Sequence, residues 1–215
     1  MTMYQQLPMS SIKWFYVFFL SLAHYVSWIG LQLCYQFITQ ETFQSICSLI
    51  GVFCMLLFTS GMGITIATHR YWTHKSFKAN TPTRLLFLFA NSLANQGTIY
   101  KWARDHRLHH KYTDTDSDPH NSSRGFWFSH IGWLLVNKHP DIITKGSQHS
   151  LRDLEEDWLV MWQKRNANWF LPFVSLGIPT LLGIYFFHSW KLGLFVFGFL
   201  RWIINLHFFF HLLRQ

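Results

Sequence analysis

Hydrophobic residues gather in four long stretches along the chain. Residues 14–38 and 46–68 carry no formal charge, and each exceeds the about 20 residues with which a helix crosses a membrane. A second apolar pair covers residues 169–188 and 192–213. Proline and glycine interrupt this second pair, which membrane helices tolerate. The pattern predicts an all-α integral membrane domain with four transmembrane helices in two hairpins.

The segment between these hairpins is polar. Residues 69–168 contain 14 of the 18 Lys and Arg residues and nine of the ten Asp and Glu residues. By the positive-inside rule, we expect this histidine-rich segment and both termini to face the cytosol. Within it, residues 84–95 are apolar but too short to span, and Thr81-Pro82-Thr83 before them is typical of a helix start. This pattern predicts a helix that lies in the membrane interface.

Composition agrees with a membrane protein of one domain, residues 1–215. Half of the residues are hydrophobic and only 13% are charged, well below the fraction of a soluble domain. The net charge of +8 comes from a segment of mixed sign, so we expect no nucleic-acid partner. The three cysteines lie in apolar stretches without a CxxC pair, which predicts small buried hydrophobes.

Five histidines fall within 42 residues, at spacings that packing does not explain. His106, His109 and His110 stand at i, i+3 and i+4 and therefore share one helix face. His69 and His74 are five apart, about 140° on an ideal α-helix, where they flank a site or bind two different ions. A buried histidine needs a hydrogen-bond partner, and clustered histidines repel one another when charged. A bound metal removes both problems because it takes the neutral imidazole as its ligand. The spacings predict a metal site beneath the bilayer.

Ligand type leaves the identity of this metal open. An all-imidazole site suits zinc, copper, iron or nickel. The zinc-protease signature HExxH is absent, and no acidic residue lies between the paired histidines. Zinc also has no redox chemistry. Zinc hydrolysis is therefore the weaker reading of the two clusters.

Longer motifs surround these histidines. They are Gly63-Ile64-Thr65, His69-Arg-Tyr-Trp-Thr-His74, Trp102-Ala-Arg-Asp-His-Arg-Leu-His-His110, Asp118-Pro-His-Asn121, Arg124-Gly-Phe-Trp-Phe-Ser-His-Ile-Gly-Trp133 and Lys138-His-Pro140. In these motifs the chain resembles the membrane-bound fatty acyl-CoA desaturases of the delta-9, or stearoyl-CoA, type. The four-span layout agrees with that resemblance.

The resemblance implies a di-iron centre that activates O2 and removes two hydrogens from an acyl chain. Electrons would come from cytochrome b5 or a ferredoxin-like donor with its reductase. The iron ligands and catalytic residues that it implies are His69, His74, His106, His109 and His110. It places Arg104, Asp105 and Lys138 near the phosphate-bearing head of the acyl thioester, and Trp102 along the acyl tunnel. His120, His130 and His139 are expected to be structural.

The family pattern continues with a third box of the form HNxHH and an Asn-Ser-x-x-His segment, and this chain contains neither. We therefore expect a C-terminally truncated member of the family. About eight ligands serve two irons at usual coordination numbers, and five are visible. His207 and His211 stand at i, i+4 at the cytosolic end of the fourth apolar stretch, from which they can supply two more.

The leading interpretation is an iron-dependent acyl-CoA desaturase of lipid biosynthesis, with membrane lipid around it. A membrane hydroxylase with similar histidine clusters and a catalytically inactive fragment are the alternatives. Product analysis separates the first two, and iron content identifies the third. The expected location is the endoplasmic reticulum in a eukaryote and the plasma membrane in a bacterium.

Overall fold

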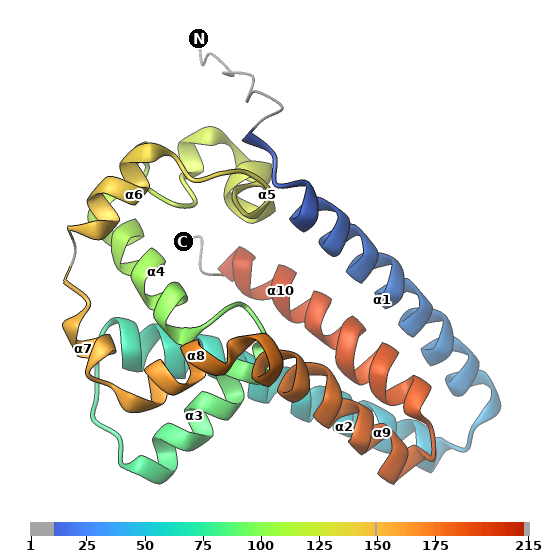
Figure 1. Ribbon diagram of the computed structural model, residues 1–215. Helices are drawn as coiled ribbons and strands as arrows, with labels where there is room; N and C mark the ends of the chain where they lie inside the picture. Colours follow the sequence, from blue (N-terminus) through green and yellow to red (C-terminus); the bar gives the residue numbers. More distant parts are fainter. Residues whose placement is uncertain (1–10, 149, 213–215) are drawn as a thin grey trace.

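Long apolar helices form one part of the molecule, and short helices form the other. The computed structural model describes residues 11–148 and 150–212 (Figure 1). Three of its helices are long and apolar enough to cross a membrane: Trp14–Gln40, Phe43–Thr73 and Trp158–Phe187. A shorter apolar helix covers Leu192–Phe208. Over the described residues the chain is helical without a named strand, as the hydrophobic pattern predicts.

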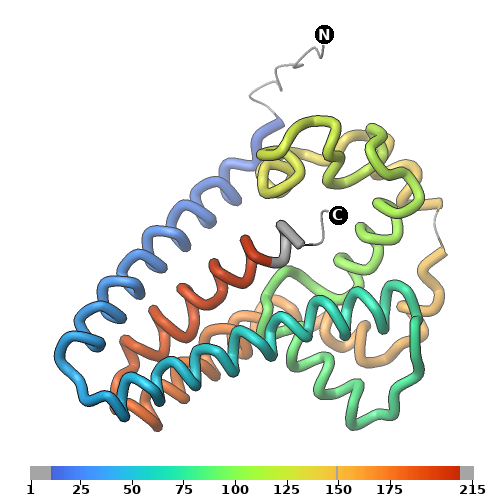
Figure 2. Tube along the Cα trace, turned by 180° about the vertical axis from the view of Figure 1, so that it is seen from behind, coloured from blue at the N-terminus to red at the C-terminus, as the bar shows by residue number. Residues whose placement is uncertain are grey.

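The long helices are built from consecutive α-helical and π-helical pieces. Helix α1 covers Trp14–Gln40 and is α-helical throughout. The other two long helices and the shorter apolar helix are each composite, and the shorter one runs beside α1 (Figure 2). Their pieces are α2 (Phe43–Met62) with η2 (Gly63–Thr73); α8 (Trp158–Pro172) with η5 (Phe173–Gly177) and α9 (Ile178–Phe187); and η6 (Leu192–Leu200) with α10 (Arg201–Leu212).

Short connections join these helices in pairs. The first follows Gln40, and Thr42 caps α2 by accepting a hydrogen bond from the backbone N–H of Ser45. The second follows α9, where His188 adopts a left-handed conformation with φ of 48°. The Ser189 hydroxyl then accepts the N–H of Leu192 at the start of η6. Both turns lie where the breaks in the hydrophobic pattern predict them.

Two helix boundaries differ from those predicted. The second long helix continues through Thr73, and the third begins at Trp158 instead of residue 169. The Asp157 side chain caps that start by accepting the N–H groups of Leu159 and Val160. Hydropathy locates the part of a helix that is apolar, whereas capping residues and backbone hydrogen bonds decide where the helix begins.

The polar segment folds into short helices that cover one end of the bundle. They are α3 (Thr81–Ala94), α4 (Ile99–Tyr112), η3 (Ser122–Arg124), η4 (Phe128–Gly132), α5 (Trp133–Leu135), α6 (Pro140–Ser147) and α7 (Arg152–Glu155). Helix α3 confirms the helix predicted after Thr81-Pro82-Thr83, with Asn80 as its cap. An apolar cluster packs η2, α3, α4, α7 and α8 together through Ala67, Leu88, Ile99, Leu154 and Leu159. These contacts fix the positions of the two histidine-bearing helices, η2 and α4.

One cation is buried among the long helices. Arg201 has no exposed surface, and its guanidinium donates to the carbonyl oxygens of Leu93, Ser175 and Phe197 at 2.8–3.0 Å. These three acceptors belong to α3, η5 and η6. Backbone carbonyls thus solvate a charge that would otherwise be costly in an apolar setting.

Candidate metal centre

The first histidine cluster lies at the end of the π-helical segment η2. His69 and His74 are five residues apart, and the N–H of His74 bonds to the carbonyl of His69 at 3.0 Å. In a π-helix each turn closes by such an i to i+5 bond, so residues five apart lie on the same side. Their Nε2 atoms are 3.1 Å apart. The π-helix therefore converts a divergent α-helical spacing into a convergent pair.

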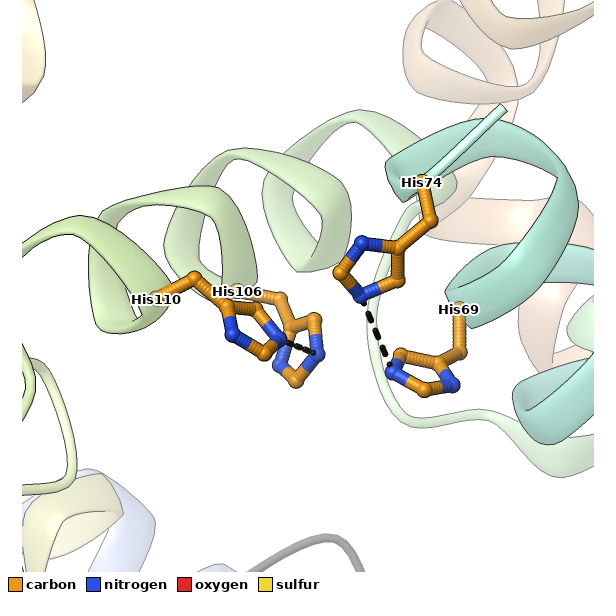
Figure 3. A group of neighbouring side chains, drawn as sticks. All are labelled: His69, His74, His106 and His110. Atoms are coloured by element: carbon orange, nitrogen blue, oxygen red, sulfur yellow. Dashed lines mark hydrogen bonds between the residues drawn. The ribbon is translucent and has the colours of Figure 1, made fainter. Parts of the chain in front are cut away.

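The second cluster lies on α4. His106 and His110 are one helical turn apart, and their Nε2 atoms approach to 3.0 Å. The His106 ring lies 4.7 Å from the His69 ring, and the His110 ring lies 4.7 Å from the His74 ring, centroid to centroid. Figure 3 shows the four imidazoles facing one another from the two helices. One ring nitrogen from each histidine lies within 4.8 Å of the others.

Burial favours the neutral form of these histidines. His106 is 6% exposed, and desolvation, helped by neighbouring His69 and His110, lowers its pKa to about 2. Desolvation and the charge of Arg107 lower the pKa of His74, and desolvation and His74 lower that of His110. Neutral imidazoles bind a metal without first losing a proton. The donor set therefore fits a transition-metal ion that takes nitrogen ligands.

His109 does not join this group of four. At i+3 from His106 it points about 60° to one side of it and 100° from His110. It lies instead with Asp118 and His120, which form a second group whose ligand atoms are within 4.8 Å of one another. The His109 Nδ1 is 2.9 Å from both carboxylate oxygens of Asp118, and the His109 and His120 ring centroids are 4.2 Å apart.

Asp118 anchors this second group. Its side chain is fully buried, and it accepts the backbone N–H groups of Asp114 and His120 as well as the His109 imidazole. Burial raises the pKa of Asp118, but these hydrogen bonds outweigh burial and the pKa falls below its usual value. The carboxylate thus stays charged and makes Nδ1 the protonated nitrogen of His109, which leaves Nε2 free to bind a metal. Desolvation by burial, together with the nearby His109, lowers the pKa of His120 to about 4.

His207 lies in a different cluster. Its Nε2 is 2.8 Å from Nε2 of His24 on α1, and its Nδ1 is 2.9 Å from Nε2 of His130 on η4. Both ring nitrogens are therefore engaged outside the two candidate metal groups. The structure thus brings His207 together with His24 and His130, and not with the five histidines expected to bind metal. The side chain of His211 lies outside the described residues.

The residues predicted to contact substrate border the histidines. The Trp102 ring lies 4.7 Å from the His106 ring, centroid to centroid. Asp105 is buried, and its carboxylate oxygens pair with Arg104 at 2.9 Å and Lys138 at 2.6 Å. Burial lowers the pKa of Lys138, and Asp105 opposes that shift. A cavity of about 390 Å³ lies beside them, lined by residues that include Tyr100, Arg104, Asp105, Lys138, Ile142 and Glu155.

Sequence reasoning did not single out Asp118 and treated His120 as structural. The only signal for them is the run Asp118-Pro-His-Asn121, which follows α4 by a few residues. The role of this run depends on a turn after α4 that brings Asp118 back to His109. Within that turn, Asp114 has a φ of 60°. A turn of that kind does not produce a periodic pattern.

The helical membrane-type fold and the two groups of histidines define a membrane protein with a candidate metal centre. The family model for fatty acid desaturases matches residues 45–214. That match covers well over half of the chain, and the chain belongs to the fatty acid desaturase family.

Known relatives agree with this assignment. An acyl-CoA Delta-9 desaturase of Acheta domesticus is 46% identical over 158 residues, which is 73% of this chain and 44% of that protein. An acyl-CoA Delta12-desaturase of the same species is 52% identical over 125 residues, or 58% of this chain and 35% of that protein. An acyl-CoA Delta(11) desaturase of Trichoplusia ni is 42% identical over 203 residues, or 91% of this chain and 54% of that protein. The matched part of the chain spans between about a third and just over half of the length of these relatives.

Proposed function

We propose that this chain forms the membrane core of an acyl-CoA desaturase, an oxidoreductase that introduces a double bond into a fatty acyl chain. The observation that carries the proposal is the group formed by His69, His74, His106 and His110. Two clusters more than 30 residues apart in sequence supply two neighbouring pairs of ring nitrogens. Since the chain belongs to the fatty acid desaturase family, we infer that a metal held by this group takes part in oxidation and reduction.

We assign iron as the metal of these groups. The four-histidine group would hold one ion, and His109 with Asp118 and His120 would hold or orient a ligand to a second ion. Bound iron would supply the O2 activation and hydrogen removal that no side chain here provides. The chain's own contribution is to keep the imidazoles neutral and to fix the Nδ1 proton of His109 through Asp118.

The acyl-CoA would lie with its head group near Arg104, Asp105 and Lys138. A guanidinium and an ammonium group suit phosphate, and these two already converge on one buried carboxylate. Trp102, whose ring lies 4.7 Å from that of His106, offers an aromatic wall to the acyl chain. We propose the delta-9 position for the double bond. The relatives include Delta-9, Delta(11) and Delta12 desaturases, so the position must be measured.

The proposed topology has four spans in two hairpins, with Leu192–Leu212 as the fourth span. The composite helix made of η6 and α10 packs against α1 and α9 and is apolar over Leu192–Phe208. The histidine groups would then face the cytosol, where a cytochrome b5 or ferredoxin-like donor can reach them. Endoplasmic reticulum in a eukaryote, or plasma membrane in a bacterium, is the corresponding location.

The fatty-acid profile of a host that expresses the 215-residue chain tests the function. We expect a new monounsaturated acid by gas chromatography–mass spectrometry, and its loss in the His106→Ala variant. A hydroxylated product would identify a hydroxylase instead. An unchanged profile, with the chain present in membranes at substoichiometric iron, would contradict the proposed activity for this chain and favour an inactive fragment.

A further inference from the structure

A buried glutamine on α8 connects the two histidine-bearing helices, although α8 contributes no histidine to either group. Gln163 has no exposed surface. Its amide oxygen accepts the N–H of Ile99 at 2.9 Å, and its amide nitrogen donates to Asn91 at 2.7 Å and Ser92 at 2.9 Å. Three elements, α3, α4 and α8, therefore meet at this one side chain.

One end of this network reaches α4. Ile99 is the first residue of α4, and its N–H has no partner within the helix because it lies in the first turn. Gln163 supplies that partner. Since α4 is a continuous helix, its start fixes the height and rotation of His106, seven residues or about two turns further along.

The other end reaches η2. Asn91 accepts from Gln163 and donates to the hydroxyl of Thr68 at 2.7 Å, and Thr68 donates to the carbonyl of Gly63 at 2.9 Å. Thr68 directly precedes His69 and is completely buried. Its hydroxyl spans five residues of the same π-helical segment that brings His69 and His74 together.

Close backbone packing occurs at the same junction. A side chain at Gly63 would overlap the backbone of Ala90 and Asn91, so η2 and α3 are in direct contact there. This contact prevents α3 from sliding away from η2. The polar network and the glycine contact therefore act on one joint between the two helices.

We propose that Gln163 is a positioning residue, which through Asn91 and Thr68 sets the separation between η2 and α4 and so brings the four histidines within reach of one ion. The inference rests on the proposed function, because it concerns the metal of that site. A chain of buried, mutually paired polar groups is geometrically demanding, since each lost partner leaves another group unsatisfied. Gln163 touches neither the metal group nor the cavity beside Lys138.

The test compares metal binding by the purified 215-residue chain in detergent, with Co²⁺ as the probe. In Gln163→Met, which keeps length but cannot hydrogen bond, we expect Co²⁺ affinity to fall by about tenfold and the visible absorption bands to change. Thr68→Val breaks only the far end of the network and should act in the same direction. Ser27→Ala is the matched control, because it removes a buried hydrogen bond from Ser27 to the carbonyl of Ala23, within α1, which packs against η6 and α10.

Hydrogen exchange of the metal-free chain gives a second readout. Amides in the first turn of α4 should exchange faster in Gln163→Met than in the unmodified chain. If Gln163→Met does not fold, Thr68→Val decides the metal-binding result. Unchanged Co²⁺ affinity and spectrum in the folded variants would overturn the proposal.

The two hypotheses fail in different ways. If the unmodified chain binds no Co²⁺, the proposed metal function fails. Hydrogen exchange of the Ile99 amide then still tests whether Gln163 holds the start of α4. If this amide exchanges equally slowly in Gln163→Met and in the unmodified chain, that role is overturned as well. A fall in thermal stability alone, with normal Co²⁺ binding, would reduce Gln163 to a packing residue and contradict the positioning role.

Discussion

Arg107 and Asp153 form a two-pronged ion pair, with nitrogen–oxygen distances of 2.9 and 2.7 Å. The same guanidinium donates to the backbone carbonyl of Trp72 at 2.8 Å and to that of Thr73 at 3.3 Å. Arg107 follows His106, and Thr73 precedes His74. Arg107 therefore ties the middle of α4 to the end of η2 and to Asp153 on α7, while the Gln163 network joins the start of α4 to Thr68 in the middle of η2.

Asp153→Asn should lower stability and change its pH dependence. The hydrogen bonds from Arg107, with help from Lys75, hold the pKa of Asp153 well below its usual value. The charged form therefore contributes stability that is fully present above an unfolded-state pKa of about 3.9 and declines as the pH falls below it. We expect a loss of about 1 kcal/mol at pH 7. Thermal unfolding at several pH values measures it.

The unmodified chain and Asp153→Asn should become more alike in stability as the pH falls through 4 toward the lower native pKa of Asp153. Arg152→Gln is a suitable control, because the side chain of Arg152 is 82% exposed and pairs with Glu156, which is also exposed. A stability difference independent of pH between 3 and 7 would show that Asp153 acts through packing.

His110→Ala should remove metal from the four-histidine group. His110 is one of four candidate ligands, and three imidazoles cannot restore the same coordination. We expect Co²⁺ affinity to fall by at least about tenfold, measured by equilibrium titration. His139→Asn provides the control, since His139 is exposed and asparagine can still accept the N–H of Asp141 that caps α6. Equal loss in both variants would argue against a specific site.

Gly63→Ala should destabilise the junction of η2 and α3. The added methyl group would meet the backbone of Ala90 and Asn91, which cannot move without shifting a helix. Overpacking of this kind costs roughly 1–3 kcal/mol. Gly51→Ala is the comparison on the same long helix, since nothing lies within 4 Å of the added atom. Thermal unfolding in detergent should show a fall for Gly63→Ala and little change for Gly51→Ala.

Asp118→Asn should disorganise the second group without unfolding the chain. An amide offers one acceptor oxygen, whereas Asp118 accepts from His109, Asp114 and His120 through two oxygens. We expect a loss of about 1–3 kcal/mol, because buried donors lose a charged partner. Chemical denaturation measures the loss, and iron analysis should show less than the metal content of the unmodified chain. Unchanged values for both quantities would contradict the anchoring role.

Hydropathy predicted the long helices, and histidine spacing predicted half of the candidate site. The pair His106 and His110 follows from an ordinary α-helix, so its convergence was readable from the sequence. The pair His69 and His74 was not, because its convergence depends on a π-helical segment. A π-helix is rare and appears mostly as a short bulge inside an α-helix, so a 3.6-residue spacing rule does not predict it.

Other parts of the site depend on contacts distant in sequence. His109 separates from its neighbours because a turn returns Asp118 to it, and His207 meets His24 across 183 residues. No local pattern carries such information. Gln163 likewise has an unremarkable position in the sequence, and its role follows only from the three helices around it.

The three carbonyls around Arg201 have a consequence for the order in which the chain assembles. A guanidinium near the middle of a lone helix costs about 3 kcal/mol to insert into a membrane. Two of its acceptors, Leu93 and Ser175, lie outside the helix that carries it. We therefore expect the last helix to enter the bilayer stably only when α3 and η5 are already beside it. Arg201 would thus make insertion of the proposed fourth span depend on α3 and η5 having already folded, during synthesis itself.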